Sequence, residues 1–270
     1  MTSPATTTPA LLPGGAALSF QNGQLMLEQV ALSALAREHG TPLFVYSKAA
    51  ILSALAAYQR GFAGRRAQIC YAMKANASLA ILRLLAEAGC GFDIVSVGEL
   101  ERALAAGATP SKIVFSGIGK TRQEMRRALE VGIGCFNVES LPELDVLSEV
   151  AQSCGQRAPV SIRVNPNVDA RTHPYISTGL KGNKFGIAHE QALAAYRHAA
   201  SLPGLRVAGI DCHIGSQITE VAPYLEAMDR VLDLVTAIEA AGIAIGHIDF
   251  GGGLGIDYRG ETPPAADALW

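Results

Sequence analysis

The sequence predicts an α/β protein whose main part is a (β/α)8 barrel of the TIM type. Short apolar runs end near Lys74, Ser96, Gly117 and Glu139, at intervals of 21 or 22 residues. A strand followed by a helix every twenty-odd residues is typical of a parallel sheet. Polar residues end nearly every run, which favours a closed barrel, because all its strand ends meet at one mouth. In an open doubly wound sheet only one crevice is used.

The first residues are expected to lie outside this repeat. Residues 1–15 are rich in Thr, Pro and Ala and have no basic stretch, so they predict a flexible tail and not a signal peptide. Residues 17–27 alternate in polarity on both sides of Asn22 and Gly23. This dipeptide between alternating runs is a strong β-hairpin signal.

A helix is predicted over residues 28–39, ended by Gly40, and a short strand over residues 43–46. We assign residues 16–45 to a separate N-terminal segment and residues 46–270 to the barrel.

The barrel part has seven predicted strands from residue 67 onward. The later strands span 159–165, 207–214 and 246–250, and helices are predicted over 98–106, 121–131 and 141–154. Two of these helices begin with capping boxes, Thr121 with Glu124 and Ser140 with Glu143. Residues 256–270 show no pattern of an eighth strand.

Composition excludes several classes of protein. The chain has 270 residues, 49% hydrophobic and 17% charged, with a net charge of −2, so neither a disordered chain nor a nucleic-acid binder is predicted. No run of about 18 apolar residues suggests a membrane span. The five cysteines are odd in number and lack a CxxC spacing, which indicates reduced thiols in a cytoplasmic protein.

Lys74 is the first candidate for chemistry because it follows a strand and precedes a helix. Strand ends of this kind carry the reactive groups of α/β barrels. An amine that loses water there becomes a nucleophile toward the aldehyde of pyridoxal phosphate (PLP). The alternative is a lysine that merely extends its ammonium group into water.

The glycine run Gly251, Gly252 and Gly253 follows the last predicted strand. Backbone N–H groups without neighbouring Cβ atoms close easily around a phosphate. A tight turn explains the run equally well.

Other candidates lie at the remaining strand ends. Alternation places Asp211 and His213 on one strand face, so we expect His213 at the mouth, as a cofactor contact. Ser216 follows at a turn where its hydroxyl group can hold phosphate. Asp93 is expected near Lys74, and Arg163 either balances cofactor charge or pairs with a structural carboxylate. The irregular stretch 169–185 is expected to be a loop covering an acidic substrate.

The motifs together resemble the fold-type III PLP-dependent decarboxylases, and within them the diaminopimelate decarboxylase branch. The resemblance covers residues 17–260. The motifs that carry it are Tyr71-x-x-Lys74-Ala75-Asn76, Phe92-Asp93-x-x-Ser96-x-Gly98-Glu99, Lys184-Phe185-Gly186, His213-Ile214-Gly215-Ser216-Gln217 and Gly251-Gly252-Gly253-Leu254-Gly255.

This resemblance implies an alanine-racemase-like barrel and a role for each matching residue. It implies that Lys74 bonds the cofactor aldehyde, that His213 stacks on the pyridine ring and that Ser216 and Gly251 to Gly253 hold the phosphate. Asp93 and Arg163 match residues around the lysine and cofactor. A small amino acid, diaminopimelate, is the implied substrate, L-lysine the product and a homodimer the implied assembly.

The sequence also departs from that family's pattern. An eighth strand ending in Glu-Pro-Gly-Arg and a C-terminal β-domain are expected in the family and are not found before Trp270. We therefore expect a barrel truncated after strand seven, with the hairpin at 17–27 belonging to a missing β-domain. The 270 residues by themselves are expected to be inactive.

Three other functions fit parts of the sequence. Another fold-type III PLP decarboxylase would share the same motifs but act on a different amino acid. A non-catalytic PLP-binding barrel protein would share Lys74 and the glycine run. A metal-dependent barrel hydrolase would use two pairs of possible ligands, Asp211 with His213 and His247 with Asp249. The metal-dependent alternative leaves Lys74 unexplained, so our preferred interpretation has no metal site.

Overall fold

The computed structural model describes residues 17–169, 185–258 and 261–269. The chain divides into two compact units, residues 1–60 and residues 61–270. The predicted tail over residues 1–15 lies outside the described part of the chain. Within that part, no helix combines the length and the apolar character needed to cross a membrane.

The N-terminal unit contains a small antiparallel sheet. Strands β1 (Leu18–Gln21) and β2 (Gln24–Leu27) form the predicted hairpin, and Asn22 and Gly23 in its turn have φ angles of 50° and 76°. Both angles are positive, as a two-residue turn between twisted strands requires. The hairpin prediction is confirmed, and strand β3 (Val30–Ala31) extends the sheet by pairing with β2.

Two predictions in this unit need correction. The helix begins at Leu32 rather than at residue 28, because β3 takes the preceding residues into the sheet; α1 (Leu32–His39) then ends at Gly40 as predicted. The predicted strand over residues 43–46 is wrong, because no strand of the described chain pairs with this run. Helix α2 (Lys48–Gly61) follows instead, where Ser47 Oγ accepts a hydrogen bond from Ala50 N.

The second unit is built on seven parallel strands that form a curled half-barrel. They are β4 (Cys70–Ala72), β5 (Gly91–Ile94), β6 (Ile113–Phe115), β7 (Cys135–Val138), β8 (Ala158–Asn165), β10 (Leu205–Asp211) and β11 (His247–Asp249). They lie side by side in chain order, and the short β9 (Ile187–Ala188) pairs with β8. An open doubly wound sheet would reverse its order at a switch point. The barrel prediction is therefore confirmed.

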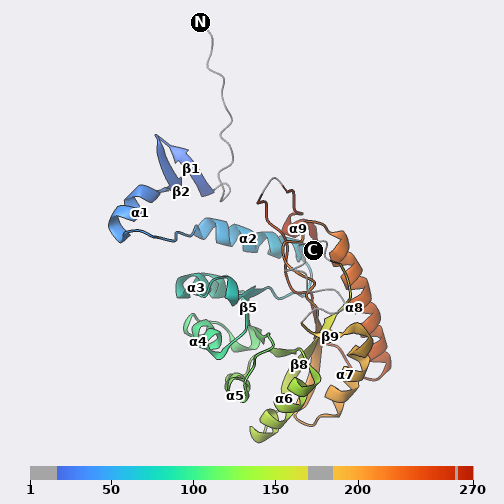
Figure 1. The fold of residues 1–270 in the computed structure, drawn as a ribbon. Coiled ribbons are helices and arrows are strands. Elements are labelled where there is room, and N and C mark those ends of the chain that lie inside the picture. The colour runs from blue at the N-terminus through green and yellow to red at the C-terminus, as the bar shows by residue number, and fades with distance from the viewer. Residues whose placement is uncertain (1–16, 170–184, 259–260, 270) are drawn as a thin grey trace. The chain divides into compact units, whose positions relative to one another are not determined.

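Helices cover the outer side of this sheet, and Figure 1 shows α3 to α8 following one another around it. They are α3 (Leu79–Glu87), α4 (Val97–Ala105), α5 (Arg122–Val131), α6 (Leu141–Ser153), α7 (His189–Ser201) and α8 (Ala222–Ala240). Short helices η2 (Met73–Ala75), η3 (Pro110–Lys112) and α9 (Ala266–Leu269) complete the described part. The three predicted barrel helices agree with α4, α5 and α6 within a residue or two.

The apolar core lies between the sheet and these helices. Phe92, Phe115 and Phe136 on the strands have no exposed surface, and neither have Leu100 and Leu144 on the helices. Burying one such side chain contributes about 1.5–3 kcal/mol. The strands therefore carry an apolar outer face, which leaves their inner face free for polar residues.

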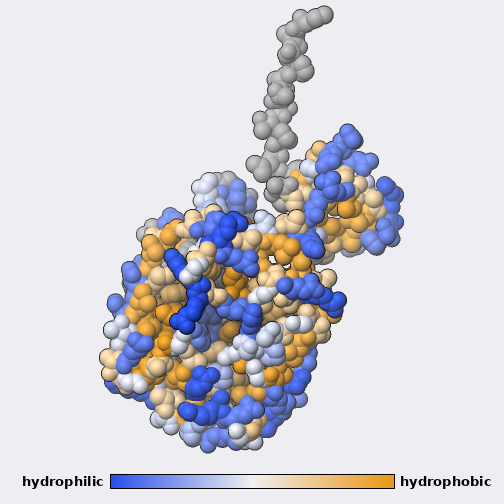
Figure 2. Space-filling view, turned by 180° about the vertical axis from the view of Figure 1, so that it is seen from behind, coloured by the Kyte–Doolittle hydropathy of each residue, from blue (hydrophilic) through white to orange (hydrophobic). Residues whose placement is uncertain are grey.

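The surface itself is mixed. Figure 2 shows apolar residues exposed among charged ones on the visible face, which is ordinary for a folded protein.

All five cysteines lie in the described part and form no disulfide bond, and Cys90, Cys135 and Cys212 are buried.

Candidate functional site

The inner face of the half-barrel is lined by polar side chains. The strand register places Asn137 opposite Ser161, and Arg163 opposite Asp211, which in turn lies opposite Asp249. Registered neighbours in a parallel sheet point to the same side. These side chains therefore face the interior of the curled sheet, which is where the site residues converge.

Lys74 lies in η2, directly after β4, and its side chain is exposed. The turn that carries it is held by Tyr71, whose hydroxyl group donates to the Asn76 carbonyl oxygen at 3.2 Å. The Tyr71 ring meets the Phe92 ring edge-on, 6.5 Å between centroids. A rigid turn thus presents the amine at the carboxyl end of the sheet, as predicted from the strand-to-helix boundary.

Asp93 on β5 lies close enough to Lys74 for the two charges to interact. The pKa of Asp93 is raised to about 6. Burial is the main cause and the charge of Asp249 adds to it, while a hydrogen bond with Ser116 and the charge of Lys74 act in the opposite direction. The Asp93 Oδ1 atom is buried without a hydrogen-bond partner. The carboxyl group of Asp93 therefore titrates closer to neutral pH than an ordinary aspartate, and its Oδ1 atom can accept a further hydrogen bond.

His213 follows β10 and lies against the glycine run. Burial, with a further contribution from the charges of Arg163 and Lys74, lowers the pKa of His213 to about 4. A Cβ atom on Gly251 would lie 2.7 Å from His213 Nδ1, so only glycine permits this approach. The imidazole is consequently neutral at pH 7, and it can present a flat, uncharged ring.

The lowered pKa of His213 predicts a loss of stability in acid. Between its ordinary value of 6.5 and about 4, the unfolded chain binds a proton that the folded protein excludes, so stability falls as the pH falls through this window. The variant His213→Asn should lose about 2–3 kcal/mol less of its free energy of unfolding between pH 7 and pH 4 than the wild type. Urea unfolding across this range measures the difference.

The comparison with the wild type is essential because Asp93 acts with the opposite sign. Its raised pKa makes the folded state more stable as the pH falls from about 6 to 3.8. This contribution is common to both proteins and cancels in the difference. Parallel pH profiles for His213→Asn and wild type would show that His213 is not a buried neutral base.

The loops after β10 and β11 are joined by their backbones. Ile218 N donates to the Gly253 carbonyl oxygen at 2.8 Å, and Gly255 N donates to the Ile218 carbonyl oxygen at 2.9 Å. Gly253 has a φ angle of 97°, and a Cβ atom there would overlap the Gly215 carbonyl oxygen. A Cβ atom on Gly252 would meet nothing within 4 Å, and Ser216 is exposed. The expected phosphate residues thus lie on adjoining loops around an open space.

A row of hydrogen bonds crosses the interior from β6 to β11. Asn137 Nδ2 donates to Ser116 Oγ at 3.2 Å and to Asp249 Oδ2 at 3.4 Å, while Asp249 Oδ1 accepts from Gly251 N at 2.8 Å. Strands β7 and β11 are not neighbours in the sheet, so Asn137 bridges across it. This side chain therefore helps to fix the glycine run.

Arg163 on β8 forms an ion pair with Glu139, 3.1 Å from Nη1 to Oε1. The Arg163 guanidinium lies 5.3 Å from the centroid of the Phe185 ring, and a Cβ atom on Gly186 would lie 3.0 Å from the Arg163 carbonyl oxygen. Of the two predicted roles, pairing with a carboxylate is thus observed, and the arginine charge also reaches His213. Most of the predicted loop over 169–185, residues 170–184, lies outside the described residues.

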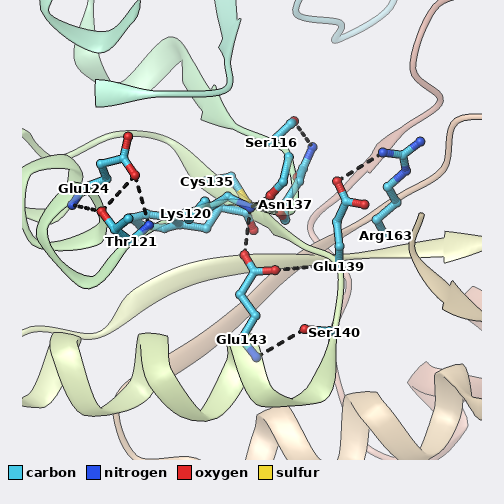
Figure 3. Close-up of polar contacts among 12 residues, drawn as sticks. Ser116, Lys120, Thr121, Glu124, Cys135, Asn137, Glu139, Ser140, Glu143 and Arg163 are labelled. Carbon is cyan, nitrogen blue, oxygen red and sulfur yellow. Dashed lines mark hydrogen bonds and ion pairs between the residues drawn. The ribbon is translucent and has the colours of Figure 1, made fainter. Parts of the chain in front are cut away.

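Lys120 is a second lysine at this end of the sheet, and Figure 3 shows it between two strand ends and α6. Its Nζ atom is 2.7 Å from Glu143 Oε1, and only 1% of the side chain is exposed.

The predicted capping box of Ser140 and Glu143 is only half right. Ser140 Oγ accepts from Glu143 N, but Glu143 Oε2 accepts from Glu139 N instead of from Ser140 N. The other predicted box, at the start of α5, is complete.

Sequence reasoning missed Ser116, Lys120, Asn137 and Glu143 as parts of the site. For Asn137 a signal existed, because polar residues at alternate positions of β8 mark its inner face and Asn137 is the polar residue of the preceding strand β7. Ser96 serves as the N-cap of α4, where its side chain accepts a hydrogen bond from Glu99 N.

The predicted metal alternative finds no support in the geometry. Asp211 is buried, and burial raises its pKa well above the ordinary value, with the charge of Asp249 adding to the effect. In the described part of the chain, no group of three or more His, Cys, Asp or Glu residues could hold a metal ion.

The sequence matches known proteins over most of its length. Residues 48–268 match the family model described as the pyridoxal-binding domain of pyridoxal-dependent decarboxylases. The diaminopimelate decarboxylase of Pseudomonas aeruginosa is 57% identical over 248 residues, 92% of this chain and 60% of that protein. The corresponding enzyme of Vibrio cholerae is 57% identical over 244 residues, 90% of this chain and 58% of that protein. The chain thus spans about 60% of the length of these relatives.

Solved structures agree with this similarity. Diaminopimelate decarboxylase from Helicobacter pylori, in complex with L-lysine, is 43% identical with a TM-score of 0.85, covering 88% of this chain and 60% of that one. The M. jannaschii enzyme, also with L-lysine, is 40% identical with a TM-score of 0.88, covering 94% and 61%. The chain therefore belongs to the pyridoxal-dependent decarboxylases, through the domain that binds pyridoxal.

Proposed function

We propose that this chain is the cofactor-binding part of a diaminopimelate decarboxylase, which releases CO₂ from meso-2,6-diaminopimelate to give L-lysine. The proposal places PLP on Lys74. The observation that carries it is the exposed amine of Lys74 on a rigid turn, beside a neutral His213 and an acid whose pKa is raised. The identity to named diaminopimelate decarboxylases, over about 60% of their length, supports the choice of substrate.

The residues present fit PLP in three ways. Gly252 and Gly253 leave backbone N–H groups unscreened by Cβ atoms, while Gly251 N is held by Asp249 Oδ1. Ser216 adds an exposed hydroxyl group on the adjoining loop. The uncharged ring of His213 is suited to stacking on a pyridine ring. When bound, PLP supplies an electron sink for the negative charge left after CO₂ departs.

Lys74 and Lys120, both within the described residues at this end of the sheet, differ sharply in accessibility. Lys120 is buried, and its Nζ atom is occupied by Glu143 and by the carbonyl oxygens of Gly117 and Asn137. Lys74 is exposed and lies close to Asp93, a carboxyl group that can exchange a proton with a neighbour near neutral pH. This contrast supports Lys74 as the lysine that bonds the cofactor aldehyde.

Arg163 and Asp93 complete the proposed site. The Arg163 cation, fixed by Glu139, would balance negative charge on the cofactor or substrate, and its field disfavours protonation of His213. Asp93 would accept a hydrogen bond through its unused Oδ1 atom. A homodimeric assembly in the cytoplasm belongs to the same proposal, and light scattering of the purified protein tests the dimer.

Reduction with borohydride in the presence of PLP, followed by peptide mapping, tests the proposed site. We expect the label on Lys74 alone, because it combines exposure with a strand-end position. Because the 270 residues alone are expected to be inactive, release of CO₂ should be compared for diaminopimelate, ornithine and lysine in the chain extended by the family's C-terminal β-domain. We expect diaminopimelate to be preferred there by at least about tenfold in kcat/KM. Label on another lysine would refute the assignment. Label on Lys74 without CO₂ release from the extended chain would favour a non-catalytic PLP-binding barrel.

A further inference from the structure

We propose that the buried ion pair Lys120–Glu143 is a positioning device that sets Glu139, and through it Arg163, in the cofactor site. The inference rests on the proposed function, because it gives these residues a task in holding PLP. It concerns two side chains that do not themselves reach the cluster of Lys74, Asp93 and His213. The contacts form one continuous path, most of which is drawn in Figure 3.

The path begins at Lys120, whose ammonium group is fully satisfied. Its three N–H groups match three acceptors, each at 2.7 Å: the carbonyl oxygens of Gly117 and Asn137, and Glu143 Oε1. The Phe115 ring covers it, 5.7 Å from Nζ to the centroid. A buried charge is costly unless every donor finds a partner. Lys120 therefore ties the ends of β6 and β7 to the first turn of α6.

Glu143 contacts both Lys120 and the backbone of Glu139. Its Oε1 atom binds Lys120, while Oε2 accepts from Glu139 N at 2.9 Å. A capping box would have turned the second oxygen to Ser140 N. Because it contacts Glu139 instead, the carboxylate fixes the backbone of the residue whose side chain enters the site.

Glu139 then orients Arg163. Its side chain is 2% exposed, Oε1 pairs with Arg163 Nη1 at 3.1 Å, and Oε2 is buried without a donor in the described structure. A carboxylate with one unused oxygen is held mainly by its backbone, so its direction depends on the contact from Glu143. The charge of Arg163 acts on His213. A shift of Glu139 therefore changes the position of the Arg163 guanidinium and, through its charge, the protonation of the His213 imidazole.

A second ion pair provides a matched control. Arg122 on α5 and Glu149 on α6 also form an ion pair that involves helix α6, but their side chains are 59% and 62% exposed. Exposed pairs contribute little, and neither residue contacts Glu139 in the described structure. Removing the charge of Glu149 therefore reproduces the change in net charge without the positioning effect.

The test compares Glu143→Gln with Glu149→Gln. A glutamine has one oxygen, so either Lys120 or Glu139 N loses its acceptor whichever way the amide turns. We expect Glu143→Gln to bind PLP at least about tenfold more weakly, and to shift the pH midpoint of the visible cofactor band. Glu149→Gln should stay within about twofold of the wild type. Titrations are corrected for the folded fraction, measured by circular dichroism.

A double variant tests whether the path runs through Glu139. If it does, Glu139→Gln combined with Glu143→Gln should bind PLP about as weakly as Glu139→Gln alone, because both remove one function. Losses that multiply would overturn the inference. Should Glu143→Gln not fold, Glu143→Asp keeps the charge but shortens the reach, so it cannot satisfy both partners and should show the same loss.

The outcomes separate this inference from the proposed function. A wild-type protein without a PLP band that depends on Lys74 would refute both. A normal wild-type band together with unchanged affinity and pH midpoint in folded Glu143→Gln would refute only the positioning role. A loss of affinity in Glu149→Gln equal to that in Glu143→Gln would also refute it, because charge alone would then explain the effect.

Discussion

Replacement of Lys74 by alanine is expected to abolish covalent attachment of PLP and to slow decarboxylation by at least about a thousandfold. The reason is that Lys74 is the exposed amine at the site, while Lys120 is buried in an ion pair and cannot substitute for it. The fold should survive, because an exposed side chain on the η2 turn contributes little to the core. The visible cofactor band measures the first effect. CO₂ release from diaminopimelate by the chain extended with the family's C-terminal β-domain measures the second.

Lys112→Ala is the control for this experiment. Lys112 precedes β6 at the opposite end of the sheet, where its Nζ atom donates to the Gly89 carbonyl oxygen at 3.2 Å. This variant should keep the band and the activity. A cofactor band that persists in Lys74→Ala, or disappears equally in Lys112→Ala, would mean that the covalent site lies elsewhere.

Gly253→Ala is expected to cause the largest loss of stability among the glycine-run variants. Its φ angle of 97° is strained for any residue with a Cβ atom, and that atom would overlap the Gly215 carbonyl oxygen. Strain and overpacking together suggest a cost of about 2–5 kcal/mol. The Ile218 N to Gly253 carbonyl bond would be displaced as well, so PLP binding should weaken by more than about tenfold. Thermal unfolding and PLP titration measure both losses.

Gly252→Ala is the matched comparison from the adjacent position. A Cβ atom there meets no protein atom within 4 Å, and the backbone lies outside the left-handed region. Stability should therefore change by less than about 0.5 kcal/mol, while PLP affinity falls if the open space receives the phosphate. Equal destabilisation by both substitutions would contradict the view that Gly253 alone is fixed by its contact with Gly215.

Local sequence patterns were sufficient for much of the barrel. Seven strands, the helices between them and the complete capping box of Thr121 and Glu124 follow from residue periodicity and short-range hydrogen bonds. The hairpin at Asn22 and Gly23 follows from two residues that tolerate positive φ angles. Lys74 could be placed at a strand end because the boundary between a strand and a helix is itself a local feature.

The errors arose where a distant partner decides the outcome. Residues 43–46 are apolar enough for a strand, but a strand needs a neighbour, and the described chain supplies none. Residues 30 and 31 join β2 instead of the helix, because β2 offers them backbone partners. Glu143 has the right spacing for a capping box, yet Lys120, 23 residues away, and Glu139 N claim its oxygens.

The sequence by itself determined the alternation of strands and helices and the position of Lys74 at a strand end. Only the tertiary structure decided how the interior polar groups are paired. Asn137 reaches Asp249 across 112 residues of sequence, and Glu139 reaches Arg163 across 24. Such contacts form because curling of the sheet brings inner faces of separate strands together in a medium of low dielectric constant, where unpaired polar groups are costly. Pairing of this kind depends on distance in space, which no local period in the sequence records.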